Sequence, residues 1–223
     1  MTVIAVLTTF IIFLTIDYFR SRKRGVVPSG VREPVTGPAS RLQPAFVAGF
    51  ELPENLRYHP GHTWALSESP TLVRVGIDSF AASLIGENEG ITLPKRGQWI
   101  RQGQKIVTVQ RDGSKAELVS PIEGEVTNVN DAVLGDHALP GRDPYGEGWL
   151  LTVIAPDAKV SFRNLLNGTL ARRWMEDAAA RLRMRMPALA GAVAQDGGVA
   201  VDDVAAHLPD QAWSELTREF FLV

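Results

Sequence analysis

Short runs in which apolar and polar residues alternate fill residues 57–156, and this pattern constrains the fold more than any other feature of the chain. The clearest runs are TLVRVGI, KIVTVQ, AELVSP, GEVTNVN and WLLTVIA, and glycine, proline, asparagine and aspartate separate them. A period of two is typical of strands with one buried face, and frequent turn residues indicate many short strands. The pattern predicts a mainly β domain, built as a sandwich or a flattened barrel.

The first 24 residues have a different character. No charge occurs from Thr2 to Ile16, and with the next three residues the run approaches the roughly 18 to 20 residues that a helix needs to cross a bilayer. A cleaved signal peptide would carry its positive charge before the apolar run, and a buried core helix is rarely apolar on every face. Here the flank after the run consists of Tyr18, Phe19, Arg20, Arg22, Lys23 and Arg24.

This order of residues predicts a single transmembrane helix in residues 1–24 that anchors the protein in the lipid bilayer. The aromatic pair is expected at the membrane interface, and the basic cluster is expected to stay on the cytoplasmic side. We therefore predict a single-pass membrane protein with its N-terminus outside and its soluble domain on the cytoplasmic side.

Two other segments flank the β domain. Residues 25–56 contain five prolines and no sustained helical or strand period, which predicts an extended linker. Residues 157–223 are predicted to form a helical extension. Within it, apolar residues recur at helical spacing over residues 162–186, and Pro187 ends that helix.

The C-terminal end of this extension is apolar. Trp213, Leu216 and Phe220 stand at helical spacing and predict a last short helix. Phe220, Phe221 and Leu222 then make the end of the chain unusually apolar. We expect them to pack on this protein or to contact a partner.

Composition and motifs exclude several kinds of site. The chain has no cysteine, so disulfides, thiolate metal sites and cysteine nucleophiles are excluded, and a formal net charge of -2 gives no bulk attraction to nucleic acid. His59 and His62 stand three residues apart without a third ligand nearby, and neither a nucleophile elbow nor a phosphate-binding loop occurs. We predict no catalytic residue, no metal site and no enzymatic activity of its own.

Five motifs resemble, in the same order, the H protein of the glycine cleavage system: HTWAL, VRVGIDSFA, LPKRGQWI, SPIEGEVTNVN and DPYGEGWLL. The resemblance covers about residues 56–156. It implies a lipoyl-carrier domain of the barrel-sandwich hybrid or hammerhead type, with the cofactor lysine at the tip of a tight hairpin. It also implies that His62, the histidine of the H-x-W strand, belongs to the fold.

The resemblance places a glycine where the family has its lipoyl lysine. That lysine stands eight positions before the proline of the SP motif, and counting back from Pro121 gives Gly113. Counting forward from Gly103 gives the same residue. An Asp-Gly pair favours a type I′ turn, so Asp112 and Gly113 are predicted to form the hairpin tip. Lys115 lies two residues further on, about 6.5 Å down the strand, and is interpreted as a solvated strand lysine.

These features predict a non-catalytic accessory subunit without a cofactor. The degenerate H-protein-like domain would be a scaffold that binds integral-membrane subunits of a larger complex, such as a photosynthetic or respiratory one. The alternative is a lipoyl carrier that bears lipoate on Lys115 and serves a membrane-associated enzyme. A third hypothesis is that the arginine-rich face of the helix over residues 162–186 contacts anionic lipid headgroups.

Overall fold

The structure is a computed structural model, and it describes residues 45–185, Val204 and residues 210–222. The predicted anchor in residues 1–24 and most of the predicted linker therefore lie outside the described residues. The described residues all belong to one compact unit, Leu42–Val223. Among the described residues, no helix is long and apolar enough to cross a membrane.

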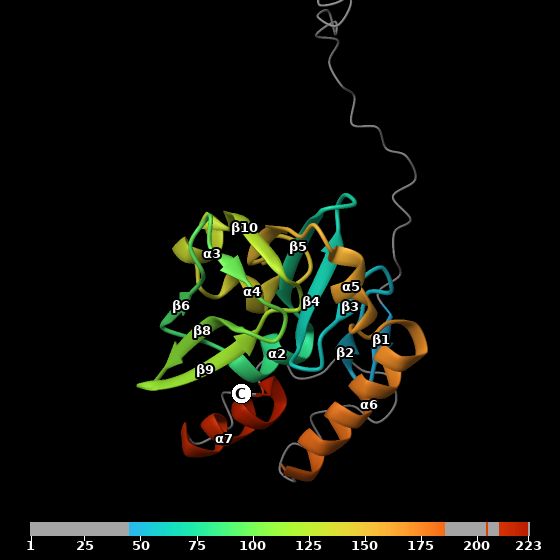
Figure 1. The fold of residues 1–223 in the computed structure, drawn as a ribbon. Coiled ribbons are helices and arrows are strands. Elements are labelled where there is room, and N and C mark those ends of the chain that lie inside the picture. The colour runs from blue at the N-terminus through green and yellow to red at the C-terminus, as the bar shows by residue number, and fades with distance from the viewer. Residues whose placement is uncertain (1–44, 186–203, 205–209, 223) are drawn as a thin grey trace, which may run out of the picture. The chain divides into compact units, whose positions relative to one another are not determined.

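The described strands pair antiparallel in three sheets (Figure 1). The largest sheet has the order β3 (Arg57–Tyr58), β4 (Thr63–Ser67), β5 (Leu72–Ile77), β11 (Leu151–Ile154), β10 (Gly124–Val129) and β7 (Trp99–Ile100). A three-stranded sheet has the order β6 (Gly90–Thr92), β8 (Lys105–Arg111) and β9 (Ser114–Val119). The third sheet is the pair β1 (Phe46–Val47) and β2 (Phe50–Glu51). The prediction of a mainly β domain is confirmed.

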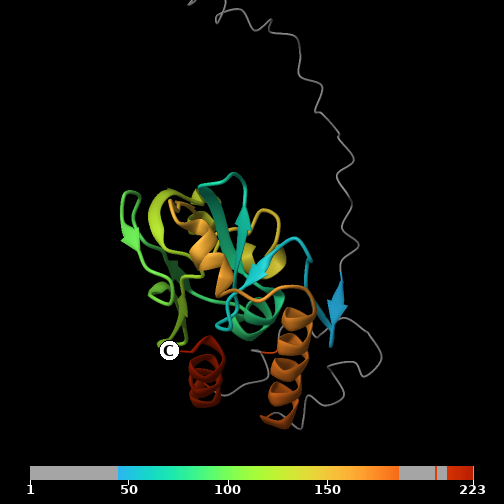
Figure 2. The same ribbon diagram turned by 45° about the vertical axis from the view of Figure 1, so that its right-hand side comes forward.

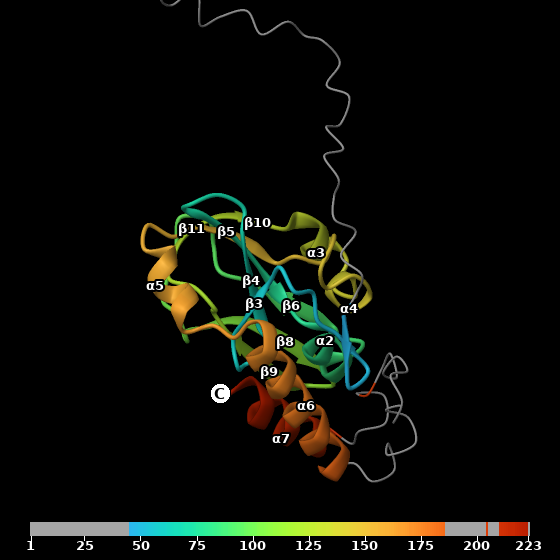
Figure 3. The same cartoon turned by 90° about the vertical axis from the view of Figure 1, so that its right-hand side faces the viewer.

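Helices connect and cover the strands (Figures 1 and 2). Their bounds are α2 (Ser79–Ile85), α3 (Asp131–Gly135), α4 (Leu139–Arg142), α5 (Ala158–Arg163), α6 (Gly168–Arg185) and α7 (Asp210–Phe221). The long helix α6 and the C-terminal helix α7 lie at the same end of the β domain (Figure 3). The helical extension predicted after residue 156 is thus present in its described parts.

The core follows from the alternation in the strands. One face of the largest sheet buries Val73 and Val75 of β5 together with Val153 of β11, and none of these three side chains is exposed. They belong to the same core cluster as Val109 and Leu118 of the three-stranded sheet. Burial of such side chains contributes about 1.5–3 kcal/mol each. The polar residues between them face outward, as the period of two predicts.

A close approach of Trp64 to Gly76 explains two of the sequence motifs. These residues are opposite each other in β4 and β5, and the indole ring fills the space that a Cβ on Gly76 would need. The indole Nε1–H donates to the carbonyl of Ile77 at 2.7 Å. The tryptophan of HTWAL and the glycine of VRVGIDSFA therefore form one packing unit.

The structure corrects the predicted linker. Residues 46–51, which the prediction placed in an extended segment, form the β1–β2 hairpin. Val47, Phe50 and Leu52 are buried in the core cluster. The reason is local: Ala48 and Gly49 both adopt positive φ and reverse the chain, so that apolar residues on either side can reach the core.

The helix predicted over residues 162–186 is also corrected. The structure has two helices there, α5 and α6, with a break between Asn164 and Asn167. Leu166 pairs with Tyr58 through two backbone hydrogen bonds of 2.9 and 2.8 Å, and Gly168 has a φ of 49°. This pairing ties the chain to β3 and interrupts the helical hydrogen bonding. Leu170, one of the apolar residues at helical spacing, is exposed, whereas Ala178 and Leu182 are buried.

Candidate functional site

The β8–β9 hairpin is the part of the fold on which the functional interpretation depends. Its last paired residues are Arg111 and Ser114, which leaves Asp112 and Gly113 as the two residues of the turn. Their φ angles of 48° and 75° are the positive values that a type I′ turn requires. Asp112 and Gly113 therefore form the tip of this hairpin. A Cβ built on Gly113 would meet no atom within 4 Å, so the tip is open to solvent on that side.

Lys115 lies beside the tip but not at it. It is opposite Gln110 in the β8–β9 pairing, and both side chains are exposed. The next residue, Ala116, is buried on the inner face of the hairpin, so Lys115 is on the outer face. Its ammonium group forms no ion pair with any residue that the structure describes. Its position fits the prediction of an exposed strand lysine.

The inner face of the hairpin is covered by α7, which packs on β9. The guanidinium of Arg111 lies 5.8 Å from the centroid of the Trp213 ring, a cation–π distance. The indole Nε1–H of Trp213 donates to the carbonyl of Leu84 in α2 at 2.8 Å. A residue adjacent to the hairpin tip is thus tied to the C-terminal helix. This link joins residues about a hundred positions apart, and no sequence signal indicated it.

Phe220 and Phe221, two of the three candidate partner contacts, follow the other alternative and pack on this protein. Both are buried in the core cluster, with exposed fractions of 1% and 0%. Phe220 packs against Phe80 with ring centroids 5.0 Å apart. Phe220 and Phe221 both lie edge-on to His62. The apolar end of the chain therefore packs on this protein. Leu222, the third candidate, is exposed.

The two histidines of the YHPGH segment have partners other than a metal. His62 Nδ1 lies 2.9 Å from the carboxylate of Asp78, and its ring stacks on Phe80 at 4.1 Å. His59 Nδ1 accepts a hydrogen bond of 3.0 Å from the backbone N–H of Gly61. Burial, and then the nearby His62, lower the pKa of His59. Within the described residues, no group of three potential ligands is placed to hold a metal ion.

Asp78 has a second role that explains the start of α2. Its other carboxylate oxygen accepts a hydrogen bond of 2.8 Å from the backbone N–H of Ala81, which is an N-cap. Both Asp78 and His62 are fully buried. The pair therefore joins the start of β4 to the start of α2, as expected for a histidine that belongs to the fold.

The DPYGEGW motif also builds the fold. The hydroxyl of Tyr145 donates to the carbonyl of Glu51 at 2.6 Å and accepts from the backbone N–H of Ser79 at 2.9 Å. Burial, and then the charge of Asp78, raise the pKa of this hydroxyl well above its ordinary value. It therefore stays protonated, and it ties β2 and α2 to the segment before β11.

Most arginines on the arginine-rich face of α6 contact other residues of this protein. Arg172 pairs with Glu54, and Arg185 pairs with Glu219 of α7 at 2.9 Å. The guanidinium of Arg181 lies 5.1 Å from the ring centroid of Phe220. These contacts hold α6 against β-domain loops and against α7, which leaves few free cations on this face for lipid headgroups.

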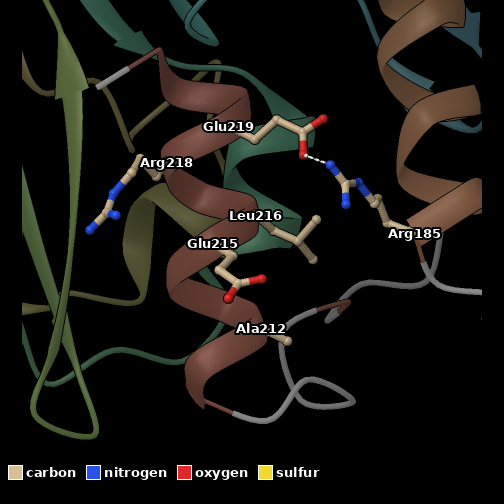
Figure 4. A pocket seen from close by; sticks show the side chains of 6 residues that line it. All are labelled: Arg185, Ala212, Glu215, Leu216, Arg218 and Glu219. Carbon is tan, nitrogen blue, oxygen red and sulfur yellow. Dashed lines mark ion pairs between the residues drawn. The ribbon is translucent and has the colours of Figure 1, made fainter.

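A cavity of about 420 Å³ lies between the end of α6 and α7 (Figure 4). The residues described around it are Arg185, Ala212, Glu215, Leu216, Arg218 and Glu219. The charged side chains are two arginines and two glutamates, and one pair is joined as an ion pair. Among these described residues the positive and negative charges balance, so they favour neither an anionic nor a cationic ligand.

Comparison with known proteins finds a family whose model matches more than half of the chain. A family model described as "Glycine cleavage H-protein" matches residues 56–178. The glycine cleavage system H protein of Gloeobacter violaceus is 36% identical over 108 residues, which are 48% of this chain and 83% of the relative. The H protein of Mycobacterium avium is 37% identical over 108 residues, which are 48% and 82% of the two chains.

A solved structure is similar as well. The crystal structure of a glycine cleavage system H protein from Mycobacterium marinum is 31% identical in sequence and covers 47% of this chain and 86% of its own, with a TM-score of 0.43. The segment that matches the family model ends within α6. Helix α7, which covers the hairpin, lies outside it.

Proposed function

Because the chain belongs to the glycine cleavage H-protein family, we propose that it is a non-catalytic member which binds other proteins at a membrane and carries no lipoate at its hairpin tip. This proposal rests on the identity of the two residues at the hairpin tip. Attachment of lipoate forms an amide with a lysine amine, and the turn residues Asp112 and Gly113 have no amine. The residues at this position therefore do not fit the group that the family implies.

Family membership and lipoate attachment depend on different residues. The shared motifs supply packing and turns, such as the approach of Trp64 to Gly76 and the hydrogen bonds of Tyr145. Attachment depends on one side chain. A fold can be retained while the chemistry of one position changes, so the family match supports the carrier fold more strongly than the carrier activity.

The membrane location and the partners are proposed from the sequence. The apolar run from Thr2 to Ile16 and the basic cluster that ends at Arg24 support a single-pass anchor with the β domain on the cytoplasmic side. An anchored domain without a reactive group is suited to hold integral-membrane subunits of a larger complex, such as a photosynthetic or respiratory one. Its exposed surface, and not a cofactor, would then carry the function.

Purification in mild detergent tests the scaffold proposal. The full-length chain is expected to bring down integral-membrane partners in stoichiometric amounts. A chain that begins at Leu42 keeps the whole described core, which lies between Val47 and Phe221, and is the matched control without the predicted anchor. Recovery of the full-length chain as a free monomer under all mild conditions contradicts the proposal.

The second candidate function is a lipoyl carrier with lipoate on Lys115. The comparisons favour it more directly than the scaffold, because both relatives described above are H proteins by name. Lys115 is also exposed and free of ion pairs with described residues. This candidate predicts a lipoyl group that Lys115→Arg removes and that Lys105→Arg, at the base of the hairpin, leaves in place.

A further inference from the structure

The segment from Leu93 to Gln110 combines positive charge with an exposed aromatic side chain. It contains Lys95, Arg96, Arg101 and Lys105 and no acidic residue. Trp99 stands in the middle of it, and 51% of its surface is exposed. A tryptophan buries a large apolar area when it finds a partner, so an indole that is half exposed beside several cations indicates a contact surface.

Trp99 lies on the outer face of the largest sheet, at its edge. In the pairing of β7 with β10 it is opposite Glu125, which is opposite Ile154 of β11. Ile154 is 45% exposed, whereas the neighbours Ile100 and Val153 are fully buried on the other face. Two large apolar side chains therefore share an exposed row across three strands.

Of the four cations in this segment, two form ion pairs with described residues and two do not. Arg96 pairs with Asp131 at 3.1 Å, and Lys105 pairs with Glu117 at 2.6 Å. Lys95 and Arg101 form no ion pair with any described residue. Arg101 follows Trp99 by two positions, just beyond the end of β7, and is exposed. Glu125 is the opposing charge within the row.

We propose that this Trp99 surface, consisting of Lys95, Trp99, Arg101 and Ile154, contacts the anionic headgroups of a bilayer. An indole ring is favoured at the membrane interface, where its apolar body and its N–H are both accommodated. Lysine and arginine near an anionic leaflet are attracted to it, and the sequence predicts that the chain is anchored there. A second copy of the chain is a poorer occupant, because the cations that flank β7 would meet the same cations of the copy and repel them.

Vesicle binding by the chain that begins at Leu42 measures this contact without the predicted anchor. The probes are vesicles of phosphatidylcholine alone and of an equimolar mixture with phosphatidylglycerol. We expect binding to the mixed vesicles that salt weakens. The double variant Lys95→Gln, Arg101→Gln should bind about 25-fold more weakly, at about 1 kcal/mol for each cation. Trp99→Ala should weaken binding by about fivefold or more.

The control variant is Arg173→Gln on α6, which removes an exposed arginine elsewhere and should leave binding unchanged. For the full-length chain in lipid nanodiscs of the mixed composition, brominated lipid should quench a part of the tryptophan emission that Trp99→Phe removes. Equal binding to both vesicle types contradicts the proposal. It is also contradicted if brominated lipid quenches the emission of the Trp99→Phe variant as much as that of the unchanged chain. An Arg173→Gln effect as large as that of the double variant contradicts it too, because it would assign the contact to α6.

Discussion

Restoring a lysine at the hairpin tip is the most informative perturbation. Gly113→Lys places an amine at the position where the family attaches lipoate. A Cβ there meets no atom within 4 Å, so no steric clash is introduced. The φ of 75° disfavours a side chain by about 1–2 kcal/mol. For a chain of this size, that cost lowers the melting temperature by about 2–8 °C, so the variant should remain folded.

The assay is intact-mass spectrometry after co-expression with a lipoate-attachment enzyme and lipoate. The Gly113→Lys variant should gain the lipoyl group, and the unchanged protein should not. Gln110→Lys is the matched control, since Gln110 is opposite Lys115 and is also exposed on the same outer face. Lipoylation of the unchanged protein to the same extent as Gly113→Lys would show that the two-residue displacement of Lys115 does not prevent attachment.

Two further predictions concern stability. Trp213→Ala should lower the free energy of unfolding by about 3–5 kcal/mol in urea titrations, whereas Trp213→Phe, which keeps a ring for Arg111, should cost less. Because burial lowers the pKa of His59 below its ordinary value of 6.5, the unfolded chain binds more protons than the folded chain just below pH 6.5. This contribution to stability is therefore complete above pH 6.5 and is lost as the pH falls below it. His59→Asn, which keeps an acceptor for the N–H of Gly61, should reduce that loss.

The strands and the hairpin tip could be predicted because their signals are local. The run LVRVGI alternates with the period of a half-buried strand and forms β5. Asp112 and Gly113 are the residues that accept positive φ, and the structure gives them positive φ. In both cases neighbouring residues suffice to determine the backbone conformation.

The features that could not be predicted depend on distant residues. The break between α5 and α6 arises because Leu166 pairs with Tyr58, which the helical spacing of residues 162–186 does not reveal. Burial of Phe220 and Phe221 depends on a surface that α2 and His62 provide. An apolar terminus indicates that a contact exists, but only the assembled fold shows that the contact is within the chain.

The mass of the full-length protein isolated from the cells that make it, together with that of its hairpin peptide, distinguishes the scaffold function from the carrier function. We predict an unmodified intact mass and a hairpin peptide in which Lys115 carries no lipoyl group. A lipoyl group on Lys115 in most of the molecules would contradict the scaffold function and establish the carrier function in its place.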